Sequence, residues 1–245
     1  LRMIEPKKII RTKRKTLSLQ INENGELIVR VPKFVSDTVI KQFVAKHRTW
    51  IDKKVREVLF KKSQLKTYTF SDGEEFLFLG KKLKLTFTHI SSSIVKKTSS
   101  VVVSGDRLLI DYSKKAKAPE LLEKFYKGEA KKIFEERVNY YLRKFNEIFD
   151  ADYSLKKIKL SSGRRILGSC SASGNMNFSW RIIQAPVEII DYLVVHEIVH
   201  LKERHHKRSF WLKVYKLKPD YRQSIVWLNE NWFYLRDFLR DKNFD

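Results

Sequence analysis

The chain has 245 residues, of which 42% are hydrophobic and 13% aromatic. This composition indicates a folded globular protein, and no run approaches the roughly 20 apolar residues that a membrane-spanning helix needs. A lone cysteine, Cys170, excludes an intrachain disulfide framework and favours a reducing cytoplasm as the location.

The formal net charge of +23 is the second global feature. Residues 1–115 carry 26 Lys and Arg against 11 Asp and Glu, a net +15, whereas residues 116–245 carry 25 against 17, a net +8. A strongly basic surface attracts polyanions, so nucleic acid is a candidate partner. The chain has no compact motif of arginines and aromatics that reads nucleic acid, and a lysine-rich composition explains the charge equally well.

The first third of the chain is predicted to be β-rich. Segments 17–21 and 27–31 alternate between apolar and polar residues, and Asn24-Gly25 between them is the signal of a type I′ hairpin. Further strands, punctuated by glycines, are expected at 68–70, 75–79, 82–89, 93–103 and 107–112.

One basic, amphipathic helix is predicted over residues 38–62, between these two groups of strands. Ser36 and Asp37 offer its N-cap, and Trp50, Ile51 and Val55 lie on its apolar side.

A polar connector at 114–119 is the best candidate boundary, because the hydrophobic period changes there from two to 3.6. We therefore expect a β-rich basic region, 1–115, followed by a catalytic domain, 116–245. The second part is predicted to contain helices at 119–149, 187–203, 209–217 and 220–241, a short strand at 158–160 and a hairpin of 166–171 with 176–183. The fold class is α+β.

His196-Glu197-Ile198-Val199-His200 is the segment that indicates function. Residues i and i+4 of a helix share a face, so the two imidazoles can bind one metal ion, and Glu197 lies close enough to take a proton from a metal-bound water. This pattern is typical of zinc hydrolases. A surface helix with solvated histidines is the alternative.

His206 is the candidate third ligand. On an unbroken helix it would lie about 15 Å along the axis from His196, so the helix must end soon after His200. No glycine is available for the turn, and His205 is the residue there that best tolerates a left-handed backbone. The reverse assignment, with His205 as the ligand, stays open.

The upstream hairpin resembles the YgjP-like metallopeptidase family. The resemblance rests on Gly168-Ser169-Cys170-Ser171, on Gly174-Asn175-Met176-Asn177, on the histidine motif and on Phe210-Trp211 after it. The N-terminal segment Lys13–Leu19 is similar to the leader of that family, so the resemblance covers most of the chain. One departure is Leu167, where the family usually has tryptophan; this change can alter the wall of the site.

The resemblance implies a zincin-like catalytic unit that holds one Zn²⁺ ion on His196, His200 and His206. It also implies that the strand around 175–182 pairs with an extended substrate. We therefore expect Asn175, Asn177, Arg181 and His205 to contribute to substrate binding, although a core hairpin explains the same residues.

The oxyanion-stabilising residue cannot be read from the sequence. Arg165, Arg181 and His205 are candidates, and a solvated or packing role suits each of them better. Cys170 is more typical of a small buried residue than of a metal thiolate.

Three classes of function follow. The first is a metallopeptidase acting on a protein or peptide, in which Glu197 activates a zinc-bound water that attacks the carbonyl. The second is a metal-dependent hydrolase of nucleotides or phosphoesters. The third is a basic nucleic-acid-associated module in which the zinc is structural, or a DNA-associated protease, which the related SprT-like and WLM families suggest.

Overall fold

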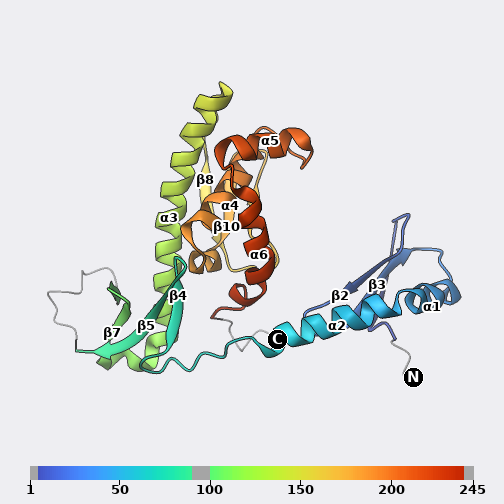
Figure 1. Ribbon diagram of the computed structural model, residues 1–245, viewed down its shortest axis with the longest axis horizontal. Helices are drawn as coiled ribbons and strands as arrows, with labels where there is room; N and C mark the ends of the chain where they lie inside the picture. Colours follow the sequence, from blue (N-terminus) through green and yellow to red (C-terminus); the bar gives the residue numbers. More distant parts are fainter. Residues whose placement is uncertain (1–4, 90–99, 240–245) are drawn as a thin grey trace. The chain divides into compact units, whose positions relative to one another are not determined.

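The structure, a computed structural model, describes residues 5–89 and 100–239 (Figure 1). The chain divides into two compact units, Leu1–Lys66 and Thr67–Asp245. Each unit has its own hydrophobic core, and the two cores share no residue.

The first unit is a three-stranded sheet covered by two helices. Its elements in chain order are β1 (Lys8–Thr12), β2 (Ser18–Ile21), β3 (Leu27–Pro32), α1 (Asp37–Lys46) and α2 (Arg48–Ser63). The central strand β3 pairs in parallel with β1 and antiparallel with β2. Alternate β3 residues, such as Val29 and Val31, point inward and pack with Ile40, Val44 and Ile51.

Two predictions for this unit are wrong in detail. The hairpin forms, but Asn24 does not have the positive φ that a type I′ turn requires; only Gly25 does, at 77°. The reason is that the Asn22 side chain accepts the backbone N–H groups of Asn24 and Glu26 and so closes a wider turn.

The predicted single helix is two helices, α1 and α2, which meet at His47. The His47 ring donates to the Phe43 carbonyl at 2.8 Å, satisfying an acceptor at the end of α1. Ser36 caps α1 as predicted, whereas Trp50 is 45% exposed and does not belong to the apolar side. Strand β1 has no clear apolar alternation and was not predicted.

The second unit contains two sheets and the remaining helices. Its strands are β4 (Glu75–Phe78), β5 (Lys81–Thr88), β6 (Val101–Ser104), β7 (Arg107–Asp111), β8 (Lys157–Ser161), β9 (Gly168–Cys170) and β10 (Asn175–Ser179). Its helices are η1 (Tyr112–Lys117), α3 (Ala118–Phe149), η2 (Trp180–Gln184), α4 (Val187–Val199), α5 (Arg208–Leu217) and α6 (Tyr221–Leu235). The strand orders are β4-β5-β7-β6 and β8-β10-β9.

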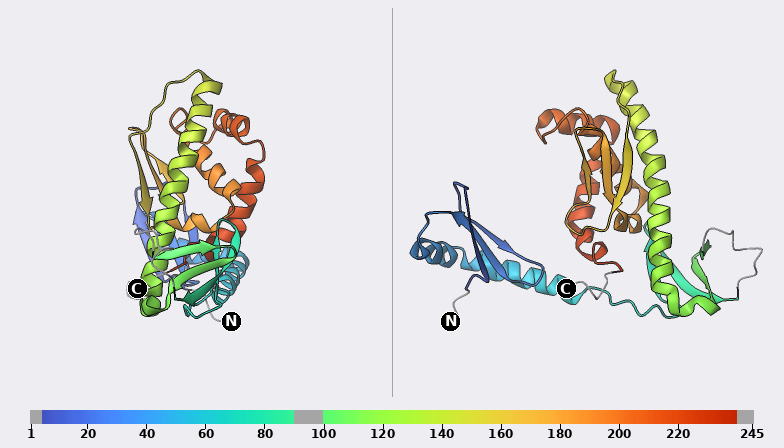
Figure 2. Two further views of the ribbon diagram at one scale, coloured as in Figure 1. Left: turned by 90° about the vertical axis from the view of Figure 1, so that its left-hand side faces the viewer. Right: turned by 180° about the vertical axis from the view of Figure 1, so that it is seen from behind.

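Helix α3 connects the parts of this unit, and Figure 2 shows it running beside both sheets. Its buried side chains recur every three or four residues, as the apolar spacing predicts. Phe134 stacks on Phe178 of β10 with ring centroids 4.2 Å apart, and the Tyr126 hydroxyl donates to the Leu77 carbonyl of β4. The helix therefore fixes the β8-β10-β9 sheet against the rest of the core.

The α+β fold class is confirmed, as are the long helix, the strand at 158–160 and the hairpin. Residues 68–70 form no strand, β10 ends at Ser179 instead of Ile183, and residues 93–99 lie outside the described part of the chain. The boundary between the compact units lies after Lys66 in the chain, whereas the sequence predicts a boundary after residue 115. The assignment of catalysis to residues 116–245 stays a prediction.

The structural boundary has a physical cause in the shared core of the second unit. The ring centroids of Phe76 on β4 and Phe238 are 6.3 Å apart, and those of Tyr126 on α3 and Phe238 are 4.7 Å apart. Strands before residue 115 and segments after it thus bury their apolar side chains together. Within 5–89 and 100–239, no helix is long and apolar enough to cross a bilayer.

Candidate metal centre

Helix α4 is buried on nearly all sides. Pro186 stands at its N-cap, and ten of its thirteen residues are buried. A helix that is apolar all round lies inside a core, and α4 packs between α3, α5 and α6. On the α3 side, Arg137 forms a bidentate pair with Asp191, 2.5 and 2.7 Å, and Tyr141 donates to the same carboxylate.

The histidine motif lies at the C-terminal end of this helix. His196 is in the last turn and His200 is the C-cap residue. The final turn tightens, because Leu201 N–H donates to the Ile198 carbonyl at 2.9 Å, and the chain then leaves the helix direction. The expectation that the helix stops near His200 is confirmed, and the end predicted at Glu203 was too late.

The left-handed backbone predicted for His205 is wrong, because His205 has a negative φ. Contacts of Glu203 hold the turn in its place. The Glu203 carbonyl accepts a hydrogen bond from the His200 ring Nδ1–H at 2.8 Å. The Glu203 carboxylate accepts hydrogen bonds from the side chains of Ser209 and Lys213 on α5. Ser209 therefore lies inside α5 and ties the loop down, instead of capping the helix as predicted; Lys207 is the N-cap residue.

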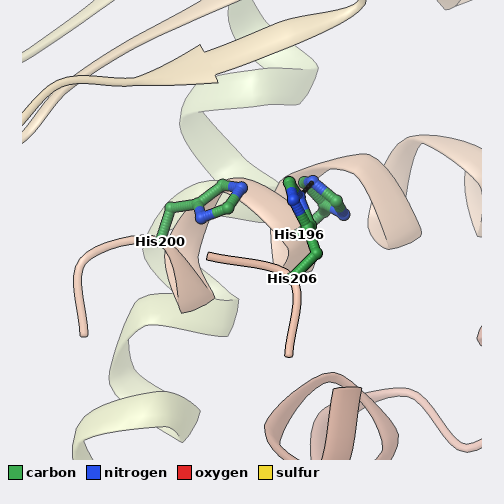
Figure 3. Close-up of side chains that lie close together, drawn as sticks. All are labelled: His196, His200 and His206. Atoms are coloured by element: carbon green, nitrogen blue, oxygen red, sulfur yellow. Dashed lines mark hydrogen bonds between the residues drawn. The ribbon is translucent and has the colours of Figure 1, made fainter. Parts of the chain in front are cut away.

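Three imidazoles converge at this turn, as Figure 3 shows. His196, His200 and His206 each offer a ring nitrogen, and these atoms all lie within 4.8 Å of one another. The His196 and His206 Nε2 atoms are 3.0 Å apart. Because a carbonyl only accepts, the His200 Nδ1–H must donate to Glu203, which leaves its Nε2 lone pair available.

Burial keeps His196 neutral, and aromatic neighbours fix the three rings. Burial, followed by the charges of His200 and His206, lowers the pKa of His196 to about 3. Phe210 packs against all three rings at centroid distances of 4.7–4.9 Å. The Trp211 indole N–H donates to the His206 carbonyl at 3.2 Å. The Phe210-Trp211 pair thus positions the third histidine.

Glu197 lies beside this cluster with only 4% of its surface exposed. Burial raises the pKa of Glu197 to about 7. Gly168 of β9 packs directly on its carboxylate, since a Cβ at residue 168 would lie 2.7 Å from Oε1. Gly168 was noted only as part of the family motif and had no predicted role, and Tyr192, whose hydroxyl is 3.5 Å from His196 Nδ1, was not predicted to belong to the site.

Of the predicted substrate-binding residues, Asn175, Asn177 and Arg181 do not line the cavity at His196 and Glu197, whereas His205 directly precedes His206 in the chain. Asn175 and Asn177 line a different cavity, whose walls also include Ser169, Cys170 and Met176. The Asn175 side chain donates to Ser173 at 2.8 Å. Strand β10 is the central strand of its sheet, with β8 and β9 on its two edges, so its predicted pairing with a substrate is wrong.

Arg181 is 6% exposed and has a structural position. Its guanidinium donates to the Phe238 and Ser162 carbonyls at 2.8 and 2.7 Å and lies over the Trp180 ring. These contacts hold the segment after α6 to the core, so Arg181 is better assigned to packing than to substrate or oxyanion. His205 and Arg165 are both exposed.

Cys170 is a partly buried thiol whose pKa is raised, first by burial. Its sulfur is not a member of the histidine cluster within the described residues. The backbone carbonyls of Cys170 and Ser171 accept the Arg204 guanidinium at 3.2 Å each, which links β9 to the loop after α4. Arg204 was not among the residues predicted from the sequence.

The family model "YgjP-like, metallopeptidase domain" matches residues 15–231, most of the chain. The chain belongs to the YgjP-like metallopeptidase family. The resemblance in the hairpin and the histidine motif is thereby confirmed, and the protein is a metallopeptidase, a hydrolase that requires a metal and acts on proteins or peptides. Family membership does not by itself identify the metal or its ligands.

The crystal structure of the metallopeptidase zymogen abylysin of Pyrococcus abyssi is similar to part of the chain. It has 20% sequence identity and a TM-score of 0.33, over 38% of this chain and 94% of that one. No curated protein matches the chain.

Proposed function

We propose that the chain is a zinc-dependent peptidase in which His196, His200 and His206 hold a single ion and Glu197 moves the proton. The observation that carries the proposal is the convergence of three imidazole nitrogens within 4.8 Å, next to a buried carboxyl group.

The residues fit a zinc ion on three physical grounds. Tetrahedral bonds of about 2.0–2.1 Å separate two ligand nitrogens by about 3.3 Å, close to the 3.0 Å between His196 and His206. Neutral imidazoles are the ligands that zinc accepts, and burial disfavours protonation of His196. Three protein ligands are also the number typical of catalytic zinc sites, which leave one position open.

When bound, zinc supplies a Lewis acid that acidifies water and polarises the substrate carbonyl. Glu197 is placed to accept the proton of the attacking water and to deliver it to the leaving amine. Gly168 lets β9 approach the carboxylate closely, so the carboxyl group is confined beside the histidines. The Glu203 carbonyl orients the His200 ring, and Phe210 with Trp211 orients His206.

We infer that the edge of β9, not β10, pairs with an extended substrate. The bonds from Ser171 N–H to Asn175 and from Ser179 N–H to Leu167 show which backbone groups of β9 face β10. By the alternation of an antiparallel ladder, the backbone groups of Gly168 point to the other edge, next to Glu197. A peptide added there would present its carbonyl to Glu197 and the histidines.

A panel of substrates tests the reaction class. Casein, a nucleoside triphosphate and a protein bound to DNA are each incubated with zinc-loaded enzyme, with and without a chelator. We expect chelator-sensitive cleavage of casein. Cleavage of the triphosphate alone would contradict peptidase activity, and cleavage only of the DNA-bound protein would favour a DNA-associated protease.

Binding of a polyanion by the first unit is a second proposal, which rests on the distribution of charge. Residues 1–66 carry 18 Lys and Arg against 6 Asp and Glu, a net +12, whereas residues 67–245 carry 33 against 22, a net +11. A uniformly lysine-rich composition does not predict that about half of the net positive charge falls within residues 1–66. We expect the full chain to bind a DNA oligonucleotide with an affinity that falls steeply with salt. Absence of binding at about 50 mM salt would contradict the proposal.

A further inference from the structure

A cavity of about 270 Å³ is lined by His196 and Glu197 of the proposed centre and extends from them to residues that have no role in the chemistry described above. Three segments form its walls. Leu167 and Gly168 come from the β9 side, Tyr192 and Leu193 from α4, and Ile225, Leu228 and Asn229 from one face of α6.

The walls of this cavity are mostly apolar. Leu193 and Leu228 are 4% and 7% exposed, and Leu167 and Ile225 pack against the same core. Tyr192 turns its hydroxyl toward His196 Nδ1. Asn229, the only amide in the lining, is exposed. Apart from Glu197, no described residue of the lining is an acid, a lysine or an arginine.

The size of the cavity suits one side chain. Pockets that enclose a whole drug-sized ligand measure roughly 300–1,000 Å³, so a cavity of about 270 Å³ takes only part of a larger substrate. The cavity also lies where a side chain next to the scissile bond would enter. Gly168, on the proposed peptide-binding edge of β9, forms one wall. Glu197, the proposed general base, forms another.

We propose that this cavity binds one apolar side chain of the substrate, at the residue that adjoins the scissile bond, and that Leu167 sets how large that side chain can be. This proposal rests on the peptidase function above. An aspartate or glutamate side chain entering the cavity would lose its hydration with no lysine or arginine among the described lining residues to compensate it. A lysine or arginine side chain would meet only the Glu197 carboxyl group, which the proposed reaction uses, so the cavity disfavours either charge. A small side chain buries less of the apolar wall. In a hydrophobic pocket, each missing methylene group lowers kcat/KM by roughly 10–200-fold.

The test profiles cleavage sites in a randomised peptide mixture with zinc-loaded enzyme, by mass spectrometry of the products. We expect leucine, methionine or phenylalanine at one position next to the scissile bond, enriched about tenfold or more over glycine, aspartate and lysine.

The variant Leu167→Trp places a larger side chain in the wall and should shift that position toward alanine and valine. The ratio of kcat/KM for a phenylalanine peptide to that for an alanine peptide should fall about tenfold or more. Ile166→Trp is the matched control, because Ile166 is 62% exposed and does not line the cavity. It should leave the ratio unchanged.

A second pair of variants tests the same cavity from its opposite wall. Asn229→Trp narrows the cavity from α6 and should shift the profile in the same direction, whereas the neighbouring exposed Glu230→Trp should not. Asn229 is exposed, so this substitution keeps the test valid if Leu167→Trp fails to fold.

The outcomes separate this proposal from the function on which it rests. If the wild-type enzyme cleaves no peptide, the peptidase proposal fails and this one with it. If it cleaves peptides with no apolar preference at any position, or if the cavity variants and their controls give the same profile, peptidase activity stands and the assignment of the cavity is wrong.

Discussion

Gly168→Ala is the substitution for which the structure gives the most definite consequence. The new methyl group would lie 2.7 Å from Glu197 Oε1 and 3.0 Å from Cγ, whereas ordinary contacts begin near 3.4 Å. The backbone of β9 is held by its ladder with β10, so the carboxylate is the part that moves, by about 0.7 Å.

Misplacement of a catalytic group by 1 Å can cost on the order of 10²-fold in rate. We therefore expect kcat/KM of Gly168→Ala to fall by about 10–100-fold, which corresponds to about 1.4–2.7 kcal/mol of lost transition-state stabilisation. Zinc content should not change, because the methyl group approaches Glu197 and not the histidines. Thermal stability should stay within a few degrees, because residue 168 does not require a positive φ.

The assay compares kcat/KM for one peptide, zinc content and the thermal midpoint in three proteins. The control is Gly128→Ala on α3, where a Cβ would meet no atom within 4 Å. It should keep wild-type activity and be as stable as the wild type or more so, since alanine favours a helix over glycine by about 1 kcal/mol. Full activity in Gly168→Ala would refute the reasoning, and so would loss of its zinc.

Three further predictions concern the ligands, the anchoring of α4 and the independence of the units. His206→Ala should lower zinc affinity sharply and His205→Ala should not, measured as metal content after dialysis; equal retention would contradict the three-histidine site. Asp191→Ala removes the bidentate partner of the partly buried Arg137 and leaves only the longer contact with Glu136 at 3.8 Å. It should lower the free energy of unfolding by about 3 kcal/mol, measured by urea denaturation; a loss under 1 kcal/mol would show that the pair does not anchor α4. Residues 67–245 alone should unfold in one cooperative transition, since the two cores share no residue; absence of a transition by calorimetry would contradict this.

Features encoded within a few neighbouring residues could be predicted from the sequence. The length of α3 followed from apolar residues at helical spacing, and the approach of His196 and His200 followed from their four-residue separation. The helix end near His200 followed from the requirement that His206 reach the same point. The proximity of Tyr192 to His196 could also have been predicted, since Tyr192 lies one helical turn before His196 on the same face.

Features that arise from contacts between distant segments could not be predicted from the sequence. Gly168 approaches Glu197 only because β9 lies against α4, and the central position of β10 depends on its parallel partner β8. The turn after His200 is held by Glu203 through Ser209 and Lys213, so no left-handed residue was needed. Local propensity suggested a left-handed His205, and tertiary hydrogen bonds determined the outcome.

A second class of errors concerns residues whose chemistry suits more than one role. Arg181 carries a charge near the hairpin, which suggested contact with a substrate. Its guanidinium instead satisfies the carbonyls of Ser162 and Phe238 in the interior. The sequence identifies a donor of hydrogen bonds, and only the packed structure identifies the acceptors.

The most direct test of the central claim is peptide hydrolysis by Glu197→Gln with zinc content measured on the same sample. The amide retains the size of the side chain but cannot accept the proton, and His196, His200 and His206 are untouched. We predict a protein that retains one zinc ion and loses hydrolysis by at least about 10²-fold, as removal of a general base does. A zinc-loaded Glu197→Gln protein that hydrolyses peptides at the wild-type rate would contradict the account.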